Sequence, residues 1–321
     1  MDRRRAVGVL LVLVSACAFG SGALFAKPAY AAGIDWLTLL AWRFAIGAVL
    51  AWCWVLASAD RRAGLRRMTQ PQVLGALGLG ALYTLNSGTY YAALQTVPAS
   101  LAALIVYIYP VIVAVLTLRI GQPLEGRRPW LALAIATLGV VLAIGGIDPS
   151  AAPPVSGILL VLASPIIYAG WIVLSARLAG ERRDRVADED DGGAATAVAG
   201  ALMMTATGAI FWLVGVGSDH PISPAEIPAA AWSGIVGVAV ISTFVAIQTF
   251  YAGAKRVGAA QAALISTIEP AYTIVLASIL LGESLSGVQL AGAVLILGAV
   301  VLAQTGIRGP VSAVRLRLAD E

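Results

Sequence analysis

Glu269 stands directly before Pro270 in an apolar stretch, "STIEPAYTIVLASILL", that runs from Ser266 to Leu281. A carboxylate within a membrane is costly to insert, so it usually faces a water-filled cavity or a partner group. Proline has no amide hydrogen, and Pro270 therefore deprives the carbonyl of Ser266 of its helical hydrogen bond. The carboxylate and the freed carbonyl predict a polar patch at depth that could bind an ammonium group or a proton.

Two similar features lie earlier in the chain. Pro110 breaks an apolar run and frees the carbonyl of Val106, and Tyr107 between them is a candidate site residue. Arg43, in "LAWRFAIG", is a cation inside another apolar run. Two alternatives without a site stay open: Arg43 could form a buried ion pair with Glu269, or its side chain could extend to the outer headgroups.

Polar side chains also recur at helical spacing along several apolar runs. Ser266 and Glu269 share one helix face, with Tyr272 beside them. The other candidate site residues follow the same pattern in three further runs: Tyr83 with Asn86, Tyr168 with Trp171, and Gln248 with Tyr251. Such stripes either hydrogen-bond to neighbouring helices or line a cavity. Hydroxyls, amides and aromatic rings with little charge favour a polar or amphipathic organic molecule over a metal ion.

The composition is that of a membrane protein. Of the 321 residues, 60% are hydrophobic and 12% charged, whereas soluble proteins are about 25% charged. The net charge of +4 comes from basic residues scattered over short loops, which form no contiguous surface for nucleic acid. His220 is the only histidine, and the sequence holds no metal-ligand cluster, P-loop or nucleophile elbow. We therefore expect no catalytic residue, no cofactor and no metal site.

Ten apolar runs are long enough to cross a bilayer as helices. They cover about residues 6–26, 35–57, 72–94, 99–118, 129–147, 156–176, 194–216, 229–252, 259–281 and 287–305. With a cytoplasmic N-terminus, 19 of the 21 Lys and Arg residues fall on the cytoplasmic side, all but Lys27 and Arg43. The positive-inside rule then predicts a multi-pass protein of the cytoplasmic (inner) membrane with both termini in the cytoplasm.

The second half of the chain repeats the first. "YAALQTVPASLAALIVYIYP", which ends at Pro110, aligns with "YAGAKRVGAAQAALISTIEP", which ends at Pro270. Each repeat holds five spans, so the second enters the membrane from the opposite side, as in many transporters with a midplane site. The predicted fold is an all-α integral membrane protein whose ten transmembrane helices form two inverted five-helix repeats. The repeats are residues 1–147 and 156–305, joined by 148–155 and followed by a cytoplasmic tail, 306–321.

These features resemble the drug/metabolite transporter superfamily, in particular its ten-helix EamA-type members. The resemblance covers about residues 6–305 and rests on the doubled repeat, "FAKPA", "WRF" with Arg43, the paired "YP" and "EP", and "LLGESL" with Glu283. It implies a central cavity, alternating access, and export of amino acids or related metabolites and drugs. The first helix lacks the carboxylate that couples protons in the small four-helix relatives, which leaves Glu269 as the candidate coupling group. Glu283 matches a family turn motif, although a solvated turn residue is the simpler interpretation.

We therefore expect a secondary transporter, not an enzyme, that exports amino acids or related small molecules. Its expected partners are a small-molecule substrate, membrane lipid and, if transport is coupled, protons, but not nucleic acid. The alternatives are an uptake transporter for a sugar or nucleotide derivative, or a non-transporting membrane protein, either a subunit or an enzyme acting on lipid-linked groups. Such an enzyme would show clustered His, Asp or Glu at an interface, and the sequence shows none. Substrate, direction, coupling ion and oligomeric state are left open by the sequence.

Overall fold

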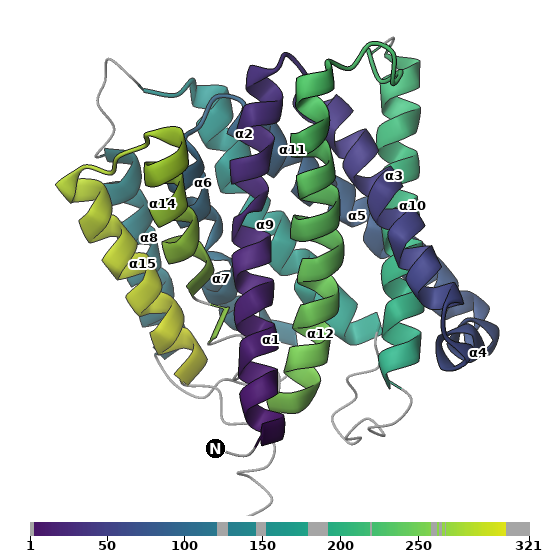
Figure 1. The fold of residues 1–321 in the computed structure, drawn as a ribbon. Helices are drawn as coiled ribbons and strands as arrows, with labels where there is room; N and C mark the ends of the chain where they lie inside the picture. Colours follow the sequence, from purple (N-terminus) through teal and green to yellow (C-terminus); the bar gives the residue numbers. More distant parts are fainter. Residues whose placement is uncertain are drawn as a thin grey trace, which may run out of the picture.

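The computed structural model describes residues 3–120, 128–145, 152–178, 192–218, 220–257, 262, 265–266 and 268–305. Over these residues the chain is helical and contains no strand. The helices stand side by side in one bundle (Figure 1). The predicted tail, 306–321, and the first half of the predicted connecting loop, 148–151, lie outside the described residues.

The first half of the chain forms eight helices. These are α1 (Arg3–Gly20), α2 (Gly22–Ala31), α3 (Trp36–Leu56), α4 (Ala59–Arg67), α5 (Gln70–Leu94), α6 (Ala99–Val106), α7 (Tyr109–Ile120) and α8 (Arg128–Gly145). The second half contains α9 (Val155–Leu178), α10 (Gly192–Gly217), α11 (Ala229–Ala239), the π-helix η2 (Val240–Val245), α12 (Ala246–Val257), α14 (Ile268–Leu281) and α15 (Gly287–Thr305).

Five helical stretches are long and apolar enough to cross a membrane. They are Arg5–Ala31, Trp36–Leu56, Val155–Leu174, Ala197–Gly217 and Ala229–Phe250. Four further apolar helices are shorter: Ala99–Val113, Trp130–Ala143, Ile268–Leu281 and Gly287–Leu302. The prediction of an all-α, multi-pass membrane protein is thus confirmed, whereas the count of ten helices and the inverted repeat stay predictions.

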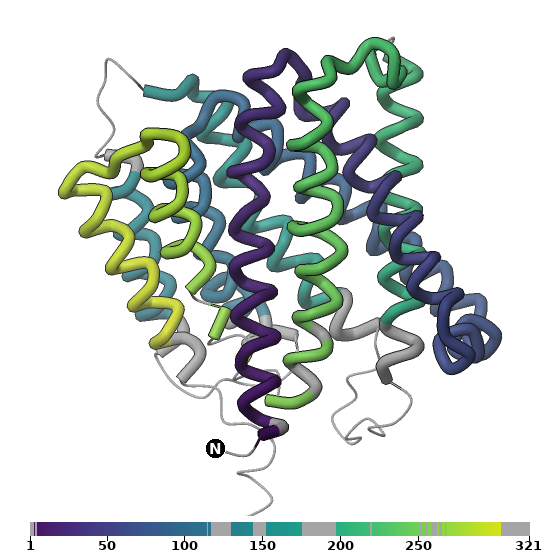
Figure 2. The backbone as a smooth tube through the Cα atoms, viewed as in Figure 1, coloured from purple at the N-terminus to yellow at the C-terminus, as the bar shows by residue number. Residues whose placement is uncertain are grey.

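Three of the predicted spans are interrupted. α1 and α2 follow one another along the same line (Figure 2) and meet at Ser21, between two glycines, where the Ser21 hydroxyl donates to the carbonyl of Cys17 at 2.8 Å. Gly and Ser are residues at which helices often bend. α6 ends at Val106 and α7 begins at Tyr109, one residue before Pro110, as the proline predicts. The π-helix η2 between α11 and α12 has no such signal in the sequence.

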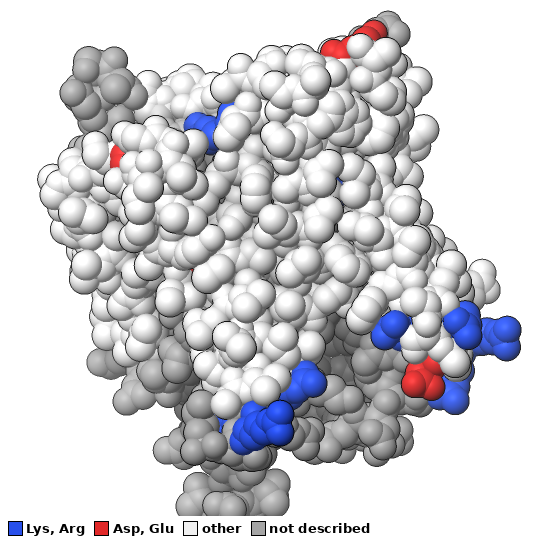
Figure 3. Space-filling view, viewed as in Figure 1, with Lys and Arg blue, Asp and Glu red and all other residues white. Residues whose placement is uncertain are grey.

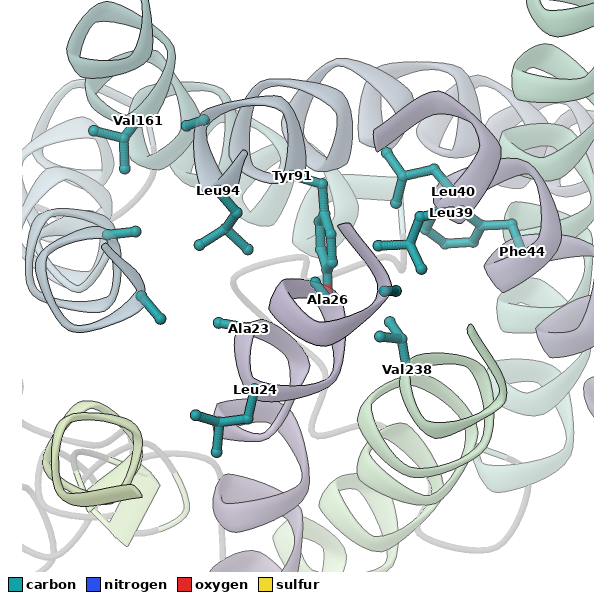
Figure 4. Close-up of a cluster of buried hydrophobic side chains, with 14 of the residues drawn as sticks. Ala23, Leu24, Ala26, Leu39, Leu40, Phe44, Tyr91, Leu94, Val161 and Val238 are labelled. Carbon is teal, nitrogen blue, oxygen red and sulfur yellow. The ribbon is translucent and has the colours of Figure 1, made fainter. Parts of the chain in front are cut away.

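The buried core joins α2, α3 and α5 in the middle of the bundle. Figure 4 shows the Tyr91 ring reaching from α5 toward α2, between Leu94 on one side and Leu39 and Phe44 on the other. Tyr91 is 4% exposed, and the neighbouring leucines are fully buried. This core fixes the relative positions of α2, α3 and α5, and the last two carry the candidate site residues Arg43, Tyr83 and Asn86.

Charge on the surface of the bundle lies mainly toward its ends (Figure 3). On the face shown in Figure 3, Lys and Arg gather mainly at the end where the N-terminus and α4 lie, and the broad middle is almost free of charge. The short helix α4, which the sequence analysis did not predict, carries Arg61, Arg62, Arg66 and Arg67. An uncharged band between charged ends is the surface that a bilayer requires.

Candidate functional site

Glu269 lies in the first turn of α14. It sits deep within the protein, yet part of its side chain remains accessible. Among the described residues its carboxylate has no hydrogen-bond or ion-pair partner, although it is close enough to interact electrostatically with tyrosines of α5 and of the α6–α7 break. These are Tyr83, Tyr90, Tyr107 and Tyr109. A buried carboxylate among phenol groups is a site for a cation or a proton.

The carbonyl of Ser266 is not free, which corrects the expectation from Pro270. It accepts a hydrogen bond from the hydroxyl of Tyr107. Tyr107 follows the last residue of α6, so the break before Pro110 places it within reach of the second half of the chain. A residue at the first proline break thereby satisfies the carbonyl freed at the second, and the Glu269 carboxylate beside it has no such partner among the described residues.

Aromatic rings form a continuous cluster, and two of its members, Tyr83 and Tyr109, interact electrostatically with Glu269. Tyr83 is central: its ring centroid lies 6.0 Å from that of Phe44, 6.5 Å from Tyr168 and 5.3 Å from Trp171. Tyr168 in turn lies 4.7 Å from Tyr109. These rings come from α3, α5, α7 and α9, so four helices contribute to this one aromatic cluster. Faces and edges of aromatic rings suit organic cations and amphipathic molecules.

Arg43 is buried at 5% exposure and does not extend to the headgroups. Its Nε donates to the Thr243 hydroxyl at 2.8 Å, and its guanidinium carbon lies 4.6 Å from the ring centroid of Tyr91 and 4.9 Å from that of Phe44. It forms no ion pair with Glu269 in the described structure. Neither alternative raised for Arg43, the ion pair with Glu269 or the extension to the outer headgroups, is therefore observed among the described residues.

Other predicted site residues have separate surroundings. Asn86 accepts a hydrogen bond from the Ser164 hydroxyl at 3.1 Å, and the Trp171 indole donates to the α5 backbone, so both join α5 to α9. Gln248 on α12 is partly buried and has no hydrogen bond within the described residues. The Tyr251 side chain lies outside the described part of the structure.

Tyr272 has no ring contact with this aromatic cluster among the described residues. It shares a 3.2 Å hydrogen bond with Ser21 and faces an open groove of about 360 Å³ between α1, η2 and α14. Cys17, in the wall of the groove, is close enough to Glu269 to interact electrostatically with it.

Sequence reasoning missed two polar residues in this region. These are Tyr91 on α5 and Ser242 on η2, whereas Ser87 and Tyr90 belong to the polar stripe of Tyr83 that the sequence shows. Ser87 and Ser242 have buried hydroxyls without a partner among the described residues. A stripe of hydroxyls on α5 was visible in the sequence. The π-helix η2 could not be predicted, because its residues Val240–Val245 contain no local sequence signal for a π-helix.

The interpretation of Glu283 as a solvated turn residue was wrong. The Glu283 carboxylate accepts the amides of Ala99 and Ser100, each at 2.8 Å, and the Ser100 hydroxyl at 2.7 Å. It thus caps the N-terminus of α6 from the loop that follows α14. Nearby, Lys27 donates to the carbonyl of Val97 at 2.7 Å.

Asp35 and His220 join two loops at the same end of the bundle. Asp35 caps α3 by accepting the Thr38 amide at 2.8 Å, and its other oxygen contacts the His220 ring. Burial alone would raise the pKa of Asp35, but the hydrogen bonds from Thr38 and His220 outweigh it and hold the pKa below its ordinary value.

Apolar broken helices around a polar, partly accessible interior are characteristic of helical membrane transport proteins. The chain belongs to the EamA-like transporter family, whose model matches residues 6–145 and 155–305. This confirms the family resemblance, and it identifies the protein as a transporter rather than an enzyme.

Named relatives are transporters as well. The chain is 25% identical over 292 residues to the uncharacterized transporter YcbK of Bacillus subtilis, covering 90% of each chain. It is 26% identical over 308 residues to the threonine/homoserine exporter RhtA of Salmonella typhimurium, covering 93% of this chain and 90% of that one. A protein of known crystal structure shares the fold, with a TM-score of 0.60 at 20% identity over 97% of this chain and 99% of the other.

Proposed function

We propose that the protein is a secondary transporter that exports amino acids or related small metabolites across the cytoplasmic membrane by alternating access. The observation that carries this proposal is the convergence of polar groups without protein partners in the interior. The Glu269 carboxylate and the hydroxyls of Tyr83, Tyr90 and Tyr109 have no hydrogen-bond partner among the described residues, and all four residues are partly buried. Unpaired buried polar groups are uncommon in proteins unless water or a ligand satisfies them.

An amino acid matches this interior chemically. Its ammonium group can bind the Glu269 carboxylate, where low polarity strengthens the attraction, and its side chain can lie against the Tyr83, Tyr168 and Trp171 rings. RhtA, which is described as an exporter of two amino acids, supports this substrate class.

Glu269 also supports a coupling role. A carboxylate without a fixed cation can be neutralised in turn by a substrate ammonium group and by a proton, so loading one would release the other as access alternates. In this proposal the two halves are inverted five-helix repeats, the membrane is crossed ten times, and both termini are cytoplasmic.

The proposal is tested by export from bacterial cells that express the protein and lack their own amino-acid exporters. Cells loaded with a mixture of the common amino acids should release at least one of them faster with the wild-type protein than with an empty vector. Glu269→Gln keeps the shape and removes the charge, so it should insert at normal levels and lose most of the export. Glu226→Gln, at an exposed carboxylate in an external loop, is the matched control and should export normally.

Two results would contradict the proposal in different ways. Release that is no faster with the wild-type protein than with the empty vector, for every amino acid, would exclude amino-acid export. Full export by Glu269→Gln would leave the function standing and remove Glu269 from it.

A further inference from the structure

Four buried residues lie close to the break between α1 and α2. They are Gly22 on α2, Arg43 on α3, Tyr91 on α5 and Ser242 on η2. A Cβ atom at Gly22 would lie 2.7 Å from the Tyr91 hydroxyl and 3.7 Å from the Ser242 hydroxyl, so both hydroxyls lie around one point. Gly22 is required here because a side chain would displace the Tyr91 hydroxyl.

The donors of this cluster are unused. The Ser242 hydroxyl, in a residue 1% exposed, has no hydrogen-bond partner. The Tyr91 hydroxyl and the two terminal nitrogens of Arg43 also have no partner among the described residues, since Arg43 uses Nε alone, for Thr243. Buried donors are rarely left unpaired, because each loses its hydrogen bonds to water without replacement.

Arg43 is held in a fixed orientation. The Thr243 hydroxyl accepts a hydrogen bond from Nε of Arg43. The ring centroids of Tyr91 and Phe44 lie 4.6 and 4.9 Å from the guanidinium carbon of Arg43. The Thr243 hydroxyl itself donates to the carbonyl of Val238, one π-helical turn earlier at 2.9 Å. The remaining edge of the guanidinium therefore presents two parallel N–H groups, the geometry that matches a carboxylate.

Two helix irregularities coincide at this place, the α1–α2 break and the π-helix η2. π-helical turns inside α-helices are frequently associated with functional sites, and interrupted helices build many substrate sites of transporters. A guanidinium and two hydroxyls can all donate hydrogen bonds, and the cluster contains no carboxylate of its own.

We propose that Arg43, Tyr91 and Ser242 form a subsite for the carboxylate group of the substrate, with Gly22 making room for the Tyr91 hydroxyl. This inference rests on the proposed function and gives the transported molecule a second anchoring point. Arg43 and Glu269 both interact electrostatically with Tyr83, Tyr90 and Tyr91 but form no ion pair with one another, so the same tyrosines lie near a cationic and an anionic group. A substrate with both an ammonium and a carboxylate group would satisfy both charged groups.

The test compares amino acids with their carboxamides, which keep the ammonium group and lack the carboxylate. Purified protein in liposomes is assayed for transport of L-threonine and L-phenylalanine and of their carboxamides. The wild-type protein should favour each acid over its amide by at least about tenfold in apparent affinity, the size expected for a hydrogen-bonded charge. Tyr91→Phe and Ser242→Ala should raise the KM for the acid several-fold and leave the KM for the amide unchanged.

Ser164→Ala is the matched control, because this buried serine already bonds to Asn86 and lies outside the cluster. It should leave the preference for the acid unchanged. Arg43→Gln should abolish the preference; since it could also impair folding, the two milder variants decide the result. Wild-type liposomes that transport neither these two nor any other common amino acid would overturn the proposed function together with this inference. Wild-type transport with an unchanged preference in Tyr91→Phe and Ser242→Ala would overturn this inference alone.

Discussion

Glu283→Ala should destabilise the protein by removing the cap of α6. The Glu283 carboxylate accepts both first amides of α6, those of Ala99 and Ser100, which have no partner within the helix. Ala99 and Ser100 are 0% and 2% exposed, so water cannot replace the lost acceptor without local opening. The variant should therefore leave two buried donors unpaired.

The magnitude follows from those two bonds. Leaving one buried donor unpaired costs about 1–3 kcal/mol, and losing an N-cap costs about 0.5–2 kcal/mol. We expect Glu283→Ala to lower the free energy of unfolding by about 2–4 kcal/mol, which is about the sum of the costs of leaving the two amides unpaired. Glu283→Gln retains one acceptor oxygen but turns an NH₂ group toward the second donor, so it should lose about half as much.

The assay is thermal unfolding of the detergent-solubilised protein. The melting temperature should fall in the order wild type, Glu283→Gln, Glu283→Ala. Glu226→Ala is the control, because this exposed carboxylate accepts only the Ser223 amide in its own loop, at 3.2 Å. Its effect should stay within about 0.5 kcal/mol. Equal melting temperatures for the Glu226 and Glu283 variants would refute the reasoning that Glu283 joins the two halves of the chain.

Three further predictions concern topology, pH and accessibility. Reporter domains fused between α4 and α5 should read as cytoplasmic and those fused near His220 as external; reversed readings would contradict the topology. Asp35→Asn keeps the helix cap and loses the charge. Because the folded pKa of Asp35 lies below its ordinary value of 3.8, its stabilisation is present above that pH and lost as pH falls through the folded pKa. The gap in melting temperature between wild type and Asp35→Asn should therefore be present at pH 7 and shrink below about pH 4; a constant gap would exclude this cause. In a background lacking the native cysteines, Tyr83→Cys should react with a water-soluble thiol reagent, whereas Leu85→Cys, at an exposed apolar position of α5, should not; equal labelling would contradict a water-accessible interior.

The class of the protein could be predicted from the sequence because it depends on properties of short segments. Apolar runs of bilayer length define membrane helices wherever they occur, and a helix period of 3.6 residues places Glu269 and Ser266 on one face. Pro110 likewise predicts a helix break by its own covalent structure, and α7 begins one residue before it. The family motifs added the transporter function.

The partners of the polar groups were decided by the tertiary structure alone. The Ser266 carbonyl bonds to Tyr107, Arg43 to Thr243, and Glu283 to the start of α6. In each case the two residues are more than 150 positions apart in the chain. A periodic pattern specifies which face of a helix is polar, but the groups it meets depend on how helices pack across the bundle. That packing also brings Tyr91 and Ser242 together at Gly22, because a close contact at Gly22 requires neighbours that the local sequence does not specify.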